Sequence, residues 1–158
     1  MNSESARMSS AAEARYRVQV PNSLPRAIKV IGLDSAGDQV IRQLNAAGWQ
    51  HAAFFTAVSR HDDLRDLEGR SRSVADEVDA ADLVVLIAGP GGHAHAAAAI
   101  GEACSRRRVM TTGFVVGVAA ASEKELSKTL VQLRPWSLMV VIAHSDDYIA
   151  DMMTALRA

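Results

Sequence analysis

The sequence predicts an α/β protein with a doubly wound, Rossmann-like parallel sheet of about five strands in the order 2-1-3-4-5, in three α/β/α layers. Short apolar runs alternate with amphipathic stretches of helical length, which is the pattern of a parallel sheet with helical crossovers. The run 82–88 (DLVVLIA) shows no polar alternation within its apolar stretch, so we expect both faces of that strand to be covered. Right-handed crossovers then place helices on both faces of the sheet.

The first half of the domain is predicted to contain a strand at 27–33, a helix at 36–47, a strand at 52–58, and short helical pieces at 64–67 and 73–78. In the first helix Val40, Ile41 and Leu44 share one face, and Gly48 is placed as the C-cap. The stretch 61–81 is the most charged, and we interpret its alternating acidic and arginine residues as a solvated face.

The second half is predicted to contain a strand at 82–88, a helix at 94–107, a strand at 109–118, a further helix, a strand at 137–143 and a last helix. Ser122 and Glu125 form an S-x-x-E capping box that opens the second of these helices. The last helix carries an apolar stripe at i, i+3, i+4 and i+7, formed by Ile149, Met152, Met153 and Leu156.

Composition limits the function classes. The chain has 158 residues with 17 basic and 18 acidic side chains, and this balance argues against a nucleic-acid partner. The longest uncharged run, 83–101, is broken by Gly-Pro-Gly-Gly and two histidines, so we expect no membrane partner. A single cysteine, Cys104, cannot form an internal disulfide, and the N-terminus lacks a signal-peptide pattern, so a cytoplasmic protein is expected.

Two regions are predicted along the chain. Residues 1–26 are rich in Ser, Ala and Arg and carry two of the four prolines, and we predict a loosely ordered arm there. An element that folds onto a partner subunit is the alternative. Residues 27–158 are predicted to form a single Rossmann-like domain.

The candidate site lies where the winding direction reverses, between the first strand and the strand at 82–88. Loops 32–38 and 89–95 should face each other there. Both lead from a strand into a helix and contain glycine, a geometry that aims backbone N–H groups at a phosphate. The first loop, GLDSAG, lacks the G-x-G-x-x-G pattern, and the chain has no G-K-[ST] sequence. Candidate cofactor-binding residues are Gly32, Asp34, Ser35, Gly37, Gly89, Gly91, Gly92 and His93.

Three stretches carry a family resemblance: AIKVIGLDSAGDQVIRQL, ADLVVLIAGPGGHAHAAAAIGEA, and VMTTGFVVG with LSKTLVQL. Together they resemble the nucleotide-binding half of FtsZ, the bacterial homologue of tubulin, over roughly 27–152. The resemblance implies GTP or GDP as the ligand of the cleft. In that family the first loop is a run of glycines, and the second continues into a threonine–glycine series that wraps the phosphates.

This sequence departs from that pattern at the phosphate loops. His93 and the following Ala-His-Ala-Ala replace the threonine–glycine series, and Asp34 adds a negative charge beside the expected phosphate position. The chain also stops at Ala158, before the family's water-activating loop and second domain. We therefore predict an FtsZ-like domain without GTPase activity that acts as a binding or regulatory module through protein–protein contacts.

Several alternatives stay open. The cleft either binds another nucleotide or small anion, or its glycines only permit tight turns. The other alternative is an enzyme that uses the strand-end histidines, with or without a metal; these are His61, His93, His95 and His144. Cys104 either has its pKa lowered by the arginines at 106–108 or is a packed helical residue.

Association is also predicted. The family continues after the last helix into a second domain, so we expect a homo-oligomer, most simply a two-fold dimer, that uses the stripe of the last helix or the arm. The alternative is that the stripe packs entirely onto its own sheet.

Overall fold

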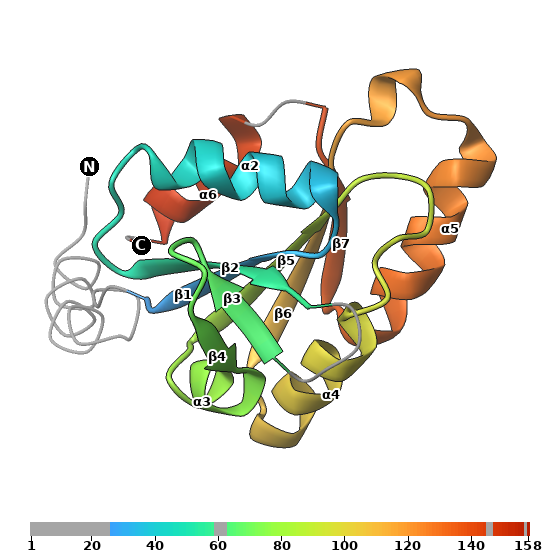
Figure 1. The fold of residues 1–158 in the computed structure, drawn as a ribbon. Helices are drawn as coiled ribbons and strands as arrows, with labels where there is room; N and C mark the ends of the chain where they lie inside the picture. The colour runs from blue at the N-terminus through green and yellow to red at the C-terminus, as the bar shows by residue number, and fades with distance from the viewer. Residues whose placement is uncertain (1–25, 59–62, 145–146, 157) are drawn as a thin grey trace, which may run out of the picture.

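A sheet with helices on both faces forms the protein, and this confirms the predicted three-layer α/β class (Figure 1). The computed structural model describes residues 26–58, 63–144, 147–156 and 158. Within them the sheet has seven strands in the order β4-β3-β2-β1-β5-β6-β7. Residues 1–25 of the predicted arm and His61 lie outside the described residues.

The strands are β1 (Ile28–Gly32), β2 (Ala52–Ala57), β3 (Asp63–Asp66), β4 (Ser71–Ser73), β5 (Leu83–Ala88), β6 (Met110–Val115) and β7 (Met139–Ile142). The α-helices are α2 (Ser35–Asn45), α3 (Val74–Asp79), α4 (Ala97–Arg107), α5 (Glu123–Leu133) and α6 (Asp147–Ala155), with 3-10 turns at Val118–Ala120 and Arg134–Trp136. Strands β2, β1, β5, β6 and β7 pair in parallel, which is the predicted 2-1-3-4-5 order.

Two local predictions are wrong. The expected helical piece at 64–67 is strand β3, which pairs antiparallel with β2 and with β4 and extends the sheet beyond the predicted strands. Leu64 is fully buried while its neighbours are not, so packing against the core favours the strand. The C-cap of α2 is Ala46 rather than Gly48, which follows it with a left-handed φ of 74°.

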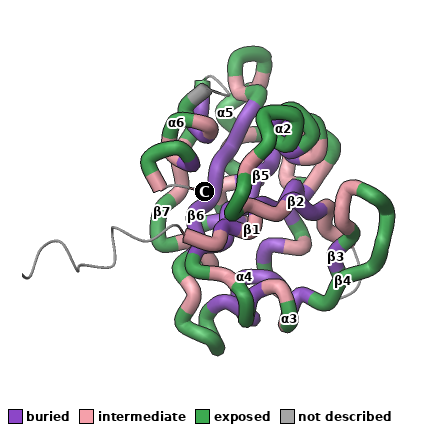
Figure 2. The backbone as a smooth tube through the Cα atoms, turned by 90° about the vertical axis from the view of Figure 1, so that its left-hand side faces the viewer, coloured by how far each residue is buried: buried purple, intermediate pink, exposed green. Residues whose placement is uncertain are grey.

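Apolar residues form one cluster on each face of the sheet. Helices α2 and α6 cover one cluster, and α3, α4 and α5 cover the other. All six residues of β5 are buried, as the continuous apolar run predicted (Figure 2). Because β5 lies next to β1 in the centre of the sheet, both loops of the candidate site start from its buried middle.

The stripe of α6 packs onto the protein's own sheet. Ile149 and Met153 are 0% exposed, and Met152 and Leu156 pack half-buried against the same cluster as α2. The prediction that this stripe is a dimer contact is therefore wrong. The physical reason is that α2 covers only part of this face, and α6 covers the remainder.

Candidate functional site

The two predicted loops meet at the carboxyl edge of the sheet. β1 and β5 are adjacent and parallel, and the Leu33 N–H donates to the Ile87 carbonyl at 2.9 Å. The first loop therefore starts beside the second, as the sequence predicted. Gly37 makes this close approach possible, because a Cβ there would lie 2.1 Å from the Ile87 carbonyl oxygen.

Asp34 joins the two loops. It is the N-cap of α2, and its carboxylate accepts a hydrogen bond from the Gly37 N–H at 2.9 Å. The same carboxylate accepts from the Gly89 N–H in the second loop, at 2.9 Å to Oδ2 and 3.1 Å to Oδ1. Two backbone donors that point into the cleft are thus already bonded to a negative charge from the chain itself.

The second loop is bonded along its length to α5. The Gly91 N–H donates to the Glu125 carbonyl at 3.0 Å, and the Gly92 N–H donates to Thr129 Oγ1 at 3.0 Å. Thr129 is fully buried, and its hydroxyl donates in turn to the Gly89 carbonyl at 2.8 Å. One hydroxyl therefore satisfies a donor and an acceptor of the loop.

Gln132 fixes the next part of the same loop. Its Oε1 accepts from the Ala94 N–H at 2.8 Å, and its Nε2 donates to the Gly92 carbonyl at 2.9 Å. Nε2 also lies 3.2 Å from Nδ1 of His95. The side-chain amide thus replaces the backbone partners that an irregular loop lacks.

Sequence reasoning did not find Thr129 and Gln132. Both belong to α5, whose predicted apolar face held Leu126, Leu130 and Leu133. Thr129 lies between Leu126 and Leu133 on that same face, so a polar residue in an apolar stripe was the available signal. Nothing in the sequence showed that this face would meet the second loop.

Asp38, in the first turn of α2, is a second carboxylate near the cleft. Its Oδ1 is buried without a hydrogen-bond partner. Burial, together with the charge of Asp34, raises the pKa of Asp38 above its ordinary value. A side-chain hydrogen bond with Thr56 and the positive charge of Arg42 lower the pKa but do not cancel this rise. The charged form of Asp38 is therefore less stable in the folded protein than in the unfolded chain.

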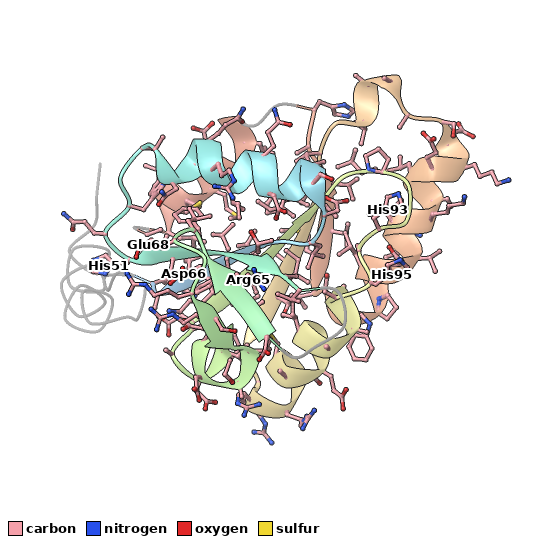
Figure 3. The ribbon with its side chains drawn as sticks, in the orientation of Figure 1. His51, Arg65, Asp66, Glu68, His93 and His95 are labelled. Carbon is pink, nitrogen blue, oxygen red and sulfur yellow. The ribbon has the colours of Figure 1, made fainter. Side chains whose placement is uncertain are left out.

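The remaining candidate residues are one buried glycine at the junction of the loops, Gly32, and two exposed residues, Ser35 and His93. Ser35 is exposed at the start of α2, and Gly32 ends β1 beside the Asp38 side chain. His93 is exposed on the second loop, and Figure 3 shows it with His95 on the side of the molecule away from His51. His144 is exposed after β7. Among the described residues, no group of three His, Cys, Asp or Glu side chains is placed to hold a metal ion.

Cys104 is a packed helical residue. It is 1% exposed in α4, and burial raises the pKa of its thiol in spite of the Thr111 hydrogen bond and the nearby Arg107. The hypothesis that the neighbouring arginines lower this pKa is wrong, because desolvation of the thiolate outweighs their charge.

A cavity of about 650 Å³ borders the second loop, on its α5 side. It is lined by Gly91, Gly92, Lys124, Ser127, Lys128, Val131 and Gln132. No residue of the first loop lines it, so it is separate from the junction that Asp34 forms.

None of the helices in the described part of the chain is both long and apolar enough to cross a membrane.

Comparison with known proteins supports the fold class. The three layers, a sheet between two layers of helices, have an FtsZ/tubulin-like, Rossmann-like fold. A solved structure titled as an empty FtsZ dimer from M. jannaschii matches with a TM-score of 0.54 and 14% sequence identity. The match covers 93% of this chain and 54% of that one, so this chain spans about half the length of the FtsZ chain. No protein-family model matches the sequence, and no curated protein matches it either.

Proposed function

We propose that this protein is an FtsZ-like domain that neither binds nor hydrolyses GTP and acts as a nucleotide-independent, protein-binding module. One observation carries the proposal: five backbone N–H groups of the two loops are bonded to the chain's own atoms. Gly37 and Gly89 donate to Asp34, Gly91 and Gly92 to α5, and Ala94 to Gln132.

The energetics oppose a phosphate at this position. A phosphate would have to displace the Asp34 carboxylate from two donors, or approach it as a second negative charge. It would also have to break the hydrogen bonds that Thr129 and Gln132 accept from the loop N–H groups. Thr129 and Gln132 would then lose these partners, at a cost in free energy. Both the charge and the hydrogen bonding therefore favour the closed cleft.

Action through protein contacts is the remaining route for this fold. The FtsZ structure of similar fold is described as a dimer. The alternative of an anion-binding cleft needs free backbone donors, and the enzyme alternative needs polar groups that converge on a substrate. The buried, unpaired Cys104 also supports the prediction of a reducing compartment such as the cytoplasm.

The test is a thermal-shift titration of the full chain with GTP and GDP, each with Mg²⁺, combined with an assay of phosphate release. A nucleotide at 100 times its dissociation constant would stabilise the fold by about 2.7 kcal/mol, which this titration detects. We expect no shift at millimolar nucleotide and no phosphate release above a buffer blank. Saturable stabilisation by GTP, or GTP-dependent phosphate release above the buffer blank, would contradict the proposal.

A further inference from the structure

Exposed apolar side chains gather at one edge of the sheet. Within the described residues the exposed large hydrophobic residues are Met110, Val131, Leu138, Met139, Ile142 and Tyr148. All of these except Val131 lie on or next to β7. The Leu138 N–H donates to the Thr111 carbonyl beside Met110, and the Tyr148 ring lies 6.0 Å from that of Phe114, which pairs with Val141.

The two edges of the sheet differ in chemistry. At one edge, β4 consists of Ser71, Arg72 and Ser73, which are short, polar and exposed. At the other edge, β7 and its flanks read SLMVVIA over 137–143, without a charged residue or a proline. Charges and prolines are what soluble proteins place on edge strands to prevent pairing with another chain. The β4 edge carries such a charge in Arg72, and the described residues 137–143 at the β7 edge carry neither a charge nor a proline. Figure 2 shows β7 at the edge of the sheet, beside β6.

We infer that β7 pairs with β7 of a second copy of this chain, antiparallel about a two-fold axis, so that one sheet continues through both copies. An identical partner is favoured because the edge is uncharged, so two copies meet without like-charge repulsion. A two-fold contact also uses the same patch on both copies and closes after two. The assembly therefore ends at a dimer instead of growing into a filament.

The exposed area is sufficient for such a contact. The five side chains on or beside β7 are between 37% and 77% exposed, and each is a large apolar group. Together they offer roughly 500 Å² per copy, at the upper end of the largest apolar patch on an ordinary monomer. Two copies then bury roughly 1,000 Å², which is the lower limit for a specific interface.

The symmetry also fixes the register. In an antiparallel pair, the side chains of two directly opposed residues point to the same face of the sheet. A two-fold axis perpendicular to the sheet leaves each face on its own side. Because side chains alternate between faces along a strand, the sequence numbers of two opposed residues must differ by an even number. Pairing centred on Val140 uses the whole of β7. It places Leu138 opposite the partner subunit's Ile142 and Met139 opposite the partner subunit's Val141.

Sedimentation equilibrium of the full chain over a hundredfold concentration range tests the association. We expect a mass approaching twice the 16.9 kDa of the monomer. Leu138→Lys places a charge on the most exposed residue of the patch and should raise the dissociation constant at least tenfold. Val131→Lys is the matched control, because Val131 is 67% exposed on α5 and should leave the dimer intact. Both variants should keep the wild-type circular dichroism spectrum and melting temperature.

A charge-pair experiment tests the register. Leu138→Glu and Ile142→Lys should each weaken self-association, and an equimolar mixture of the two should form a dimer. A wild-type mass of 16.9 kDa at every concentration would overturn the inference. A dimer that Leu138→Lys leaves intact, or a mixture that stays monomeric, would overturn it equally. None of these results depends on nucleotide binding, so the proposed function and this inference fail separately.

Discussion

Replacing Asp34 with alanine should destabilise the fold more than an ordinary loop substitution does. The side chain caps α2 through the Gly37 N–H and bonds the Gly89 N–H across the cleft, each at 2.9 Å. Loss of an N-cap costs about 1 kcal/mol. Loss of a hydrogen bond to a charged group costs about 1.5 to 3 kcal/mol, and the half-buried position of Asp34 favours the lower value. We expect the free energy of unfolding to fall by about 2 to 3 kcal/mol.

Urea unfolding at pH 7 measures this loss, and Asp34→Ser separates its two parts. Serine keeps an N-cap oxygen for α2 but is too short to bridge to Gly89, so it should lose only the cross-cleft contribution. The order of stability should therefore be wild type, then Asp34→Ser, then Asp34→Ala. An Asp34→Ser variant as stable as the wild type would show that the bridge to Gly89 contributes nothing, and our reasoning about the cleft would then be wrong.

Three further predictions concern the surroundings of the cleft. Thr129→Val should cost about 2 kcal/mol in urea unfolding, because it leaves a loop donor and acceptor unpaired, and Thr129→Ser should restore most of the loss. Gly37→Ala should cost about 3 kcal/mol or more, since its Cβ meets the backbone of Ile87; a near-neutral result would mean that the loops separate easily. Asp38→Asn should be more stable than the wild type at pH 7. Because the pKa of Asp38 is raised in the fold, its protonated form favours folding at low pH and this advantage is lost as pH rises. The gain should therefore shrink toward pH 4, and a constant gain would contradict this origin.

The central part of the fold could be predicted because local pattern and tertiary packing agree there. The continuous apolar run of β5 indicated a strand buried on both faces, and the structure buries all of it. The capping box of Ser122 and Glu125 marked the start of α5 correctly. The charged stretch 63–73 was different, because its polar residues hid two core contacts, the fully buried Leu64 and the partly buried Leu67, and it forms a hairpin. Short segments of this kind depend on their neighbours more than on their own propensity.

The candidate site could be predicted only in part. Strand order alone brings the loops after β1 and β5 together, so Asp34, Gly37 and Gly89 were expected near one another. The contribution of α5 was not predictable, because the sequence does not fix where along the strands a crossover helix packs against the sheet. Thr129 and Gln132 acquire their role only when α5 lies against the second loop. The apolar stripe of α6 gave no sign of whether its own sheet or a partner would cover it.

The central claim is that the chain's own atoms already accept the hydrogen bonds of the loop N–H groups that a phosphate would use, and an amide NMR titration tests it most directly. In ¹⁵N–¹H spectra of the uniformly labelled protein, the resonances of Gly37, Gly89, Gly91 and Gly92 report on the donors that a phosphate would use. We predict that millimolar GTP with Mg²⁺ leaves all four resonances unshifted, and that the hydrogen exchange of these amides is slow both with and without GTP. Saturable shifts of Gly37 and Gly89 on addition of GTP would contradict it.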